Sequence, residues 1–209
     1  MYLPSNDTNF LANIVSRYHG IFALEIGTGS GVILRELSKN FRVVIGTDID
    51  LYSLKHVLMI SRNERVICCD AASALQNIKF DLIVSNPPYL PSTINHVDKT
   101  VDGGPTGIEV SIHFLTSALD KLTGNAKILL LVSNLSDTCK LNRFIAKNNL
   151  AMKKIAQKDL FYETLQIIEL TNWISKLLPN LILFYGKWSL DLAAISLATL
   201  LNDVEPPKS

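Results

Sequence analysis

The sequence predicts an α/β fold in which a mostly parallel sheet of seven strands has helices on both faces and an antiparallel hairpin at one edge. Between residues 10 and 150, short apolar runs typical of buried parallel strands alternate with segments of helical periodicity. The last two expected strands have no helix between them, which favours antiparallel pairing. The expected strands are 21–26, 42–46, 65–69, 80–84, 127–132, 152–157 and 164–170.

Helical periodicity and local breakers place helices between these strands. Ser5 or Asp7 is suited to capping the first helix, and Gly20 is suited to ending it. The polar stretch 91–106 is the longest irregular segment, and loops of this length are often lids or binding loops. The expected helices run through residues 10–18, 32–40, 54–60, 72–76, 107–122 and 135–148.

The chain of 209 residues is long enough for one core with an appendage. We expect a sheet domain over residues 1–171 and a helical extension over 172–209, which carries no chemical motif and is interpreted as packing on the domain. No stretch reaches the ~18 uncharged apolar residues that a spanning helix needs, and residues 1–10 lack the pattern of a secretory signal. These features predict a protein without a membrane segment.

Composition narrows the classes of partner and the compartment. The net charge is +1 with both signs interspersed, so no global field favours nucleic acid or membrane, although a locally basic groove remains possible. The hydrophobic content of 48% and mean hydropathy of +0.24 indicate a well-filled core or a covered surface patch. Cys68, Cys69 and Cys139 form neither a disulfide framework nor a CxxC metal pair. We therefore expect no metal and a reducing, cytoplasmic location.

The stretch Glu25-Ile26-Gly27-Thr28-Gly29-Ser30-Gly31 lies at an expected strand-to-helix turn, where glycines allow a tight bend and close approach of a ligand. The pattern is GxGxG, because Val32 stands where the dinucleotide fingerprint has its third glycine. The amides at a helix start favour a carboxylate or phosphate, whereas Glu25 opposes a phosphate and can pair with an ammonium. The amino acid head group of S-adenosylmethionine carries both a carboxylate and an ammonium.

Acidic residues lie at the ends of three successive expected strands, with Glu25 at the end of the first. Asp48 closes the second strand about 20 positions after Gly27, where an acidic side chain can accept ribose hydroxyls. Asp50 is the competing residue for that contact, but it is better placed to cap the next helix. Asp70 follows the third strand and, with the Ala71 amide nearby, can reach an adenine amino group. Each aspartate alone is explained by helix capping, whereas acidic residues at three successive strand ends beside a glycine turn predict a nucleoside site.

The expected strand 80–84 runs through Ser85 into Asn86-Pro87-Pro88-Tyr89. The two prolines stiffen the backbone, so Asn86 is held at the carboxyl edge of the sheet, where ligands of open α/β sheets bind. Its side-chain oxygen and the neighbouring carbonyls can accept both hydrogens of a planar NH₂ group, and the Tyr89 ring can stack on that group. A plain strand-ending turn is the alternative, because Asn-Pro is common in turns.

Together these motifs resemble the class I S-adenosylmethionine-dependent methyltransferases, and more narrowly the HemK-type glutamine methyltransferases and their archaeal–eukaryotic branch. The resemblance covers residues 2–170 and implies a Rossmann-like domain. Asn6 departs from the pattern, since the family usually has an acidic residue there. The segments that carry the resemblance are 25–31, 47–50, Asp70 and 86–89, with 2–8, 103–107 and 163–165 similar to further family motifs.

The resemblance implies that the chain binds S-adenosylmethionine and transfers its methyl group to a planar nitrogen. Asn86, Pro87 and Tyr89 would be catalytic, with Pro88 beside them in the substrate site. The cofactor contacts that the resemblance implies are Thr8, Glu25, Gly27, Thr28, Gly29, Gly31, Asp48, Ile49, Asp70, Ala71 and Asn86.

The implied substrate is the glutamine of the Gly-Gly-Gln motif in a class I translation release factor. The Asn-Pro-Pro-Tyr motif is shared with methyltransferases of the adenine amino group in DNA or RNA, which are the alternative, and a cofactor-free interaction module is a third interpretation. The resemblance also implies a small zinc-binding activator protein that pairs with the third strand, here 65–69, unless the C-terminal extension or another copy covers exposed apolar surface. His56, His96 and His113 are expected to be structural.

Overall fold

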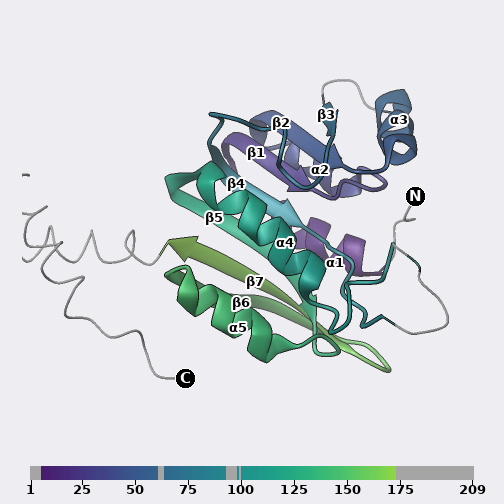
Figure 1. Ribbon diagram of the computed structural model, residues 1–209. Coiled ribbons are helices and arrows are strands. Elements are labelled where there is room, and N and C mark those ends of the chain that lie inside the picture. Colours follow the sequence, from purple (N-terminus) through teal and green to yellow (C-terminus); the bar gives the residue numbers. More distant parts are fainter. Residues whose placement is uncertain (1–5, 61–63, 93–97, 99, 173–209) are drawn as a thin grey trace, which may run out of the picture.

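The computed structural model describes residues 6–60, 64–92, 98 and 100–172, which Figure 1 shows as an open sheet flanked by helices. The predicted seven-stranded sheet is confirmed, with strand order β3-β2-β1-β4-β5-β7-β6. The strands are β1 Gly20–Ile26, β2 Phe41–Asp48, β3 Arg65–Cys68, β4 Phe80–Ser85, β5 Leu122–Ser133, β6 Leu150–Asp159 and β7 Thr164–Asn172. The helices are α1 Asn6–Val15, α2 Val32–Leu37, α3 Leu51–Ile60, α4 Glu109–Ala118, the short 3₁₀ helix η1 Leu119–Lys121 and α5 Thr138–Lys147.

The strand order reverses between β1 and β4. Strands β3, β2, β1, β4 and β5 are parallel, whereas β7 pairs antiparallel with both β5 and the edge strand β6, as the sequence predicted. Ile26 pairs with Ser85, so the turns that follow β1 and β4 begin at the same level of the sheet. The carboxyl ends of two such strands form the crevice where ligands of open α/β sheets bind.

Two apolar layers hold the helices on opposite faces of the sheet. Leu129 and Leu130 are consecutive in β5 and point to opposite sides, because side chains alternate along a strand. Leu129 belongs to the layer beneath α1, α2 and α3, whereas Leu130 belongs to the layer beneath α4 and α5. Figure 1 shows α4 and α5 lying side by side over the same face. In each layer, helix side chains pack directly against strand side chains, so helices on both faces hold the carboxyl ends of the strands in place.

The helix expected at 72–76 is wrong. Two consecutive turns replace it, in which Ser73 N donates to the Asp70 carbonyl at 3.0 Å and Leu75 N donates to the Ala72 carbonyl at 3.0 Å. Ala71 begins this segment with φ of 46° and Asn77 ends it with φ of 58°, and neither left-handed residue can continue an α-helix.

Several boundaries also differ from the expected ones. α4 begins at Glu109, because Gly107 has φ of 75°, and α5 begins at Thr138, because Asp137 caps it by accepting from Lys140 N. β5 begins at Leu122, earlier than expected.

Residues 173–209, and with them the expected helical extension, lie outside the described residues. No helix in the described ranges has the length and apolar character needed to cross a bilayer.

Candidate active site

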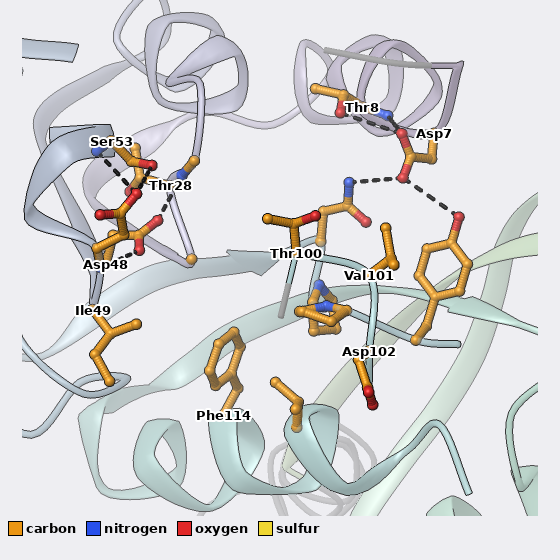
Figure 2. Close-up of a pocket in the computed structure, with 18 of the residues that line it drawn as sticks. Asp7, Thr8, Thr28, Asp48, Ile49, Ser53, Thr100, Val101, Asp102 and Phe114 are labelled. Carbon is orange, nitrogen blue, oxygen red and sulfur yellow. Dashed lines mark hydrogen bonds between the residues drawn. The ribbon is translucent and has the colours of Figure 1, made fainter. Parts of the chain in front are cut away.

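A cavity of about 910 Å³ lies at the carboxyl ends of β1, β2 and β4. Figure 2 shows Asp48 and Ile49 on one side of it, Asp7 and Thr8 on the other, and Phe114 below. Gly31 and Ala71, both predicted as cofactor contacts, are not among the residues that line it. The predicted site residues that do line it are Thr8, Glu25, Gly27, Thr28, Gly29, Asp48, Ile49, Asp70, Asn86, Pro87, Pro88 and Tyr89.

The glycine turn after β1 has the tight geometry that its composition predicts. Gly27 has φ of 78°, and a Cβ there would lie 3.1 Å from the ring of Phe114. Gly31 has φ of 73°, and a Cβ there would lie 2.9 Å from a methyl group of Val57. Gly31 is therefore explained by the packing of α2 against α3. A side chain at Gly27 would instead crowd Phe114, which also lines the cavity.

Glu25 places a buried carboxyl group at the cavity. The side chain is 3% exposed, and its Oε2 atom has no hydrogen-bond partner. Burial raises the pKa of Glu25 well above its ordinary value, and the nearby Asp48 carboxylate adds to the rise. A cationic ligand group beside Glu25 would reverse both effects, so this orphaned oxygen fits the ammonium of an amino acid head group.

Asp48 and Asp50 have different tasks at the end of β2. Asp48 accepts from Gly29 N at 2.8 Å with Oδ2, which ties β2 to the glycine turn, and from Asp50 N at 2.8 Å with Oδ1. Asp50 accepts from Ser53 Oγ at 2.6 Å and from Tyr52 N at 3.0 Å, so it holds the start of α3. Each Asp48 oxygen keeps a lone pair for a second donor, so its ribose contact stays a prediction.

Asp70 reaches the cavity rim with a partner that the sequence did not indicate. Its Oδ1 atom lies 2.8 Å from Nε2 of His113 on α4. His113 was expected to be structural, but it also lines the cavity. Ala71 instead turns inward and is 6% exposed. The contact between Asp70 and His113 joins α4 to the segment after β3, where the adenine was expected to bind.

Asn86 follows β4 and presents an unpaired oxygen. Ser85 Oγ donates to the Ile26 carbonyl at 2.9 Å, which joins the ends of β4 and β1. The Asn86 Nδ2 group donates to Asp7 Oδ2 at 3.2 Å, and the Tyr89 hydroxyl reaches the same oxygen at 3.5 Å. The Asn86 Oδ1 atom is buried in the cavity wall without a hydrogen-bond partner. An unpaired buried acceptor is costly, so its persistence indicates a place for a donor from a ligand.

Asp7 was missed as a site residue. It lies in the first turn of α1, is 4% exposed, and lines the cavity. The sequence indicated only a helix cap at this position, although its neighbour Thr8 was expected to touch the cofactor. The contact with Asn86 joins residues that are 79 positions apart, which no local pattern could reveal.

The loop before α4 forms another wall of the cavity. Leu90 N donates to the Val101 carbonyl at 2.9 Å and Gly103 N donates to the Leu90 carbonyl at 2.8 Å, so the loop is bonded to the chain just after Tyr89. Thr100, Val101 and Asp102 line the cavity from this loop (Figure 2). The expectation of a binding loop thus agrees with its position.

Glu109 holds the far end of this loop. It accepts from Thr106 Oγ1 at 2.8 Å and from Lys140 Nζ of α5 at 2.6 Å. Partial burial disfavours the charge on Glu109, but the bonds from Lys140 and Thr106 outweigh it and lower the pKa to about 2. Glu109 therefore stays ionised over the physiological range and connects the loop to two helices.

Acidic side chains dominate the cavity. No lysine or arginine is among its described lining residues, and His113 is the one basic side chain there. This wall would repel a polyanion and attract a cationic or neutral ligand. Its carboxyl groups are Asp7, Glu25, Asp48, Asp50, Asp70, Asp102 and Glu163.

Comparisons with known proteins agree with this geometry. Residues 24–102 match the family described as "Methyltransferase domain". A protein of Methanocaldococcus jannaschii assigned as a protein N5-glutamine methyltransferase is 28% identical over 145 residues, which are 65% of this chain and 74% of that protein. The release factor glutamine methyltransferase of Bradyrhizobium diazoefficiens is 30% identical over 123 residues, 50% of this chain and 41% of that protein, so the match spans less than half of the bacterial relative.

The fold is shared with a solved structure, which matches this chain over nearly the whole length of the solved chain. It is the Mtq2–Trm112 complex of E. cuniculi, described as responsible for methylation of the translation termination factor eRF1. The superposition has a TM-score of 0.68 with 25% sequence identity and covers 82% of this chain and 98% of that chain.

Proposed function

Because this chain belongs to the S-adenosylmethionine-dependent methyltransferases, we propose that it methylates the side-chain nitrogen of the glutamine in the Gly-Gly-Gln motif of a class I translation release factor. The matches to a methyltransferase domain and to N5-glutamine methyltransferases confirm the family that the sequence indicated. The named activities of the archaeal and bacterial relatives, and of the E. cuniculi complex, support the substrate.

The unpaired Asn86 Oδ1 atom is the observation that carries the proposal. It lies at the end of β4, in the same cavity as Glu25 and the glycine turn at the end of β1. A ligand that spans this cavity would therefore meet an acceptor for an ammonium at one end and an acceptor for an amide N–H at the other.

The residues present fit the cofactor. The orphaned Oε2 of Glu25 suits the ammonium, Asp48 suits the ribose hydroxyls, and Asp70 suits the adenine amino group. Thr8, Gly27, Thr28, Gly29 and Ile49 would complete the contacts. When bound, S-adenosylmethionine supplies an electrophilic methyl group.

Chemistry at Asn86 is then mainly a matter of orientation. An amide nitrogen is a poor nucleophile because its lone pair is delocalised. The Asn86 oxygen and the Pro87 carbonyl would accept its two hydrogens, which turns the nitrogen lone pair toward the methyl group and stabilises the positive charge that develops. The Tyr89 ring would flank the amide plane. Orientation of this kind is worth roughly 7–11 kcal/mol, and no general base is needed before attack, because the nitrogen loses a proton only after the methyl group has moved from sulfur to nitrogen.

The acidic cavity argues against the adenine amino group of DNA or RNA as substrate. Proteins that bind nucleic acid present lysine or arginine to the phosphates. The described lining has seven carboxyl groups and no such side chain. The shared Asn-Pro-Pro-Tyr motif keeps nucleic acid as the competing substrate. Binding of the cofactor would distinguish either enzyme from a cofactor-free interaction module.

The edge strand β3 suits a small partner protein. It ends the sheet next to β2, and no other strand of the described residues pairs with its outer side. The related Mtq2 forms a complex with Trm112, and we propose a small zinc-binding activator paired with β3 here. Its co-expression should raise yield and activity, whereas full activity of the lone chain would contradict this part.

The proposed location is the cytoplasm, where release factors act. All three cysteines are free thiols in the structure, which suits a reducing compartment.

Incubation with methyl-labelled S-adenosylmethionine tests the function directly. The panel contains a release factor, the same factor with its Gly-Gly-Gln glutamine changed to alanine, DNA and tRNA, each with and without the activator. Label is expected on the unaltered release factor alone. Label on nucleic acid, or on both forms of the release factor, would contradict the proposal.

A further inference from the structure

We propose that Asp7 is a positioning residue, which fixes the Asn86 side-chain amide so that its oxygen faces the cavity. This inference rests on the proposed function, because the Asn86 oxygen needs to face the cavity only if the methyl-accepting amide brings an N–H group there. It concerns a residue that makes no contact with the reacting atoms and acts through Asn86.

The position of Asp7 allows it to do this. α1 carries it to the cavity, where it is 4% exposed beneath the turn that follows β4. Asp7 is hydrogen-bonded to its neighbour Thr8 (Figure 2) and also to Asn86 and Tyr89. A carboxylate has no proton to donate, so the Asn86 group that faces it must be the NH₂ group. The Asn86 oxygen then lies on the other side of the amide, where it is buried and has no hydrogen-bond partner.

Both oxygens of Asp7 accept hydrogen bonds. Oδ1 accepts from Thr8 N at 2.6 Å and lies 3.3 Å from Thr8 Oγ1. Oδ2 accepts from Asn86 Nδ2 at 3.2 Å and lies 3.5 Å from the Tyr89 hydroxyl. Among side chains of this size, only a carboxylate offers acceptors on both sides.

An asparagine at position 7 has the same shape but would present an NH₂ group to one of these donors. Thr8 N belongs to the helix backbone and cannot turn, so the new NH₂ group would face Asn86. The Asn86 amide can rotate by half a turn to offer its oxygen instead. Its own NH₂ group would then face the cavity and meet the NH₂ group of the acceptor amide, so two donors would oppose each other.

A merely structural role for Asp7 makes a different prediction. An acidic residue in the first turn of a helix stabilises the helix through its dipole. Loss of that effect would lower thermal stability without turning Asn86. The orientation of Asn86 is therefore the property that separates the two roles.

The test compares the full-length chain with Asp7→Asn, alone and with the reciprocal Asp7→Asn/Asn86→Asp pair. Asp81→Asn is the matched control, because Asp81 lies in β4, the strand that precedes Asn86, accepts from Ile21 N at 2.9 Å and Phe22 N at 3.0 Å, and does not line the cavity. The readouts are the side-chain amide signals of Asn86 by NMR, cofactor affinity by calorimetry, and turnover on the release factor.

With Asp7→Asn, the Asn86 signals should move and kcat should fall about 10²–10³-fold, the usual loss when one positioned group is removed. Cofactor affinity should stay within about threefold, because the Thr8 contact is retained. In the reciprocal pair, the new amide at position 7 can donate to the new carboxylate at position 86, which again has an oxygen facing the cavity. Turnover should therefore recover at least about tenfold over the single variant.

Unmoved Asn86 signals, a kcat within about threefold of wild type, or no gain in the reciprocal pair would each overturn the role of Asp7. Loss of turnover in Asp81→Asn equal to that in Asp7→Asn would do the same. Failure of the proposed function is recognised separately: wild type would then leave the release factor unmethylated, while the NMR comparison still reports how Asp7 orients Asn86.

Discussion

Replacement of Asn86 by alanine should separate catalysis from folding. The variant removes the donor to Asp7 Oδ2 and, at the same time, the unpaired Oδ1 atom. Loss of a hydrogen bond to a charged group costs about 1.5–3 kcal/mol, whereas removal of a buried unpaired acceptor returns about 1–3 kcal/mol. These effects oppose each other, so the free energy of unfolding should change by only about 1 kcal/mol, or about 2–4 °C in melting temperature.

The expected loss in turnover is much larger. The variant has no side-chain oxygen for the acceptor amide, and removal of one such positioned group costs about 2.7–4 kcal/mol in the transition state, or 10²–10³ in kcat. Glu25 and Asp48 are unchanged, so cofactor affinity should stay close to that of wild type.

The assay is single-turnover methyl transfer at saturating cofactor, with calorimetry and thermal melting on the same samples. Asn134→Ala is the matched control: Asn134 follows β5 as Asn86 follows β4, but it is exposed and its Oδ1 accepts from Thr164 N at 2.7 Å. The control should turn over at the wild-type rate. An Asn86→Ala variant that keeps turnover within about tenfold of wild type would show that the Asn86 oxygen does not orient the acceptor amide.

Three further changes test the cofactor site and its supporting loop. Asp48→Ala should weaken S-adenosylmethionine binding by about 10–100-fold in calorimetry, since a charge-assisted bond to ribose is lost, and unchanged affinity would remove Asp48 from the site. Because the pKa of Glu25 is raised in the unliganded fold, its contribution to folding stability is fully present below the ordinary pKa. That contribution is lost as the pH rises through the raised value. Glu25→Gln should abolish this loss, and also the proton release that accompanies cofactor binding to wild type; equal release in both proteins would contradict the pairing with an ammonium. The pKa of about 2 for Glu109 means that its contribution is present above the ordinary pKa and is lost as pH falls toward 2. Glu109→Gln should therefore lower stability at neutral pH by about 1–2 kcal/mol and flatten the acid limb of the stability curve, and an unchanged melting curve would argue against this role.

Local patterns were sufficient to predict the sheet and the part of the cavity formed by the ends of β1, β2 and β4. Strand runs, glycine turns and prolines act through neighbouring residues, so they predicted where β1, β2 and β4 end. Once the strands are parallel, their carboxyl ends must meet at one edge, which brought Glu25, Asp48 and Asn86 into one cavity.

The features that the sequence did not predict depend on contacts between distant segments. Asp7 reaches Asn86 only because α1 packs on the face of the sheet to which Leu129 points. Phe114 lines the cavity because α4 crosses the opposite face. The turns at residues 71–75 replaced a predicted helix because Ala71 adopts a left-handed conformation, which propensity does not foresee.

A crystal structure of the chain with S-adenosylhomocysteine and a Gly-Gly-Gln peptide would show directly how the acceptor amide lies between Asn86 and the cofactor. We expect the peptide carboxamide nitrogen to lie within hydrogen-bond distance of Asn86 Oδ1 and to face the cofactor sulfur, with the cofactor amino group beside Glu25. A cofactor bound outside this cavity, or a peptide glutamine turned away from Asn86, would contradict it.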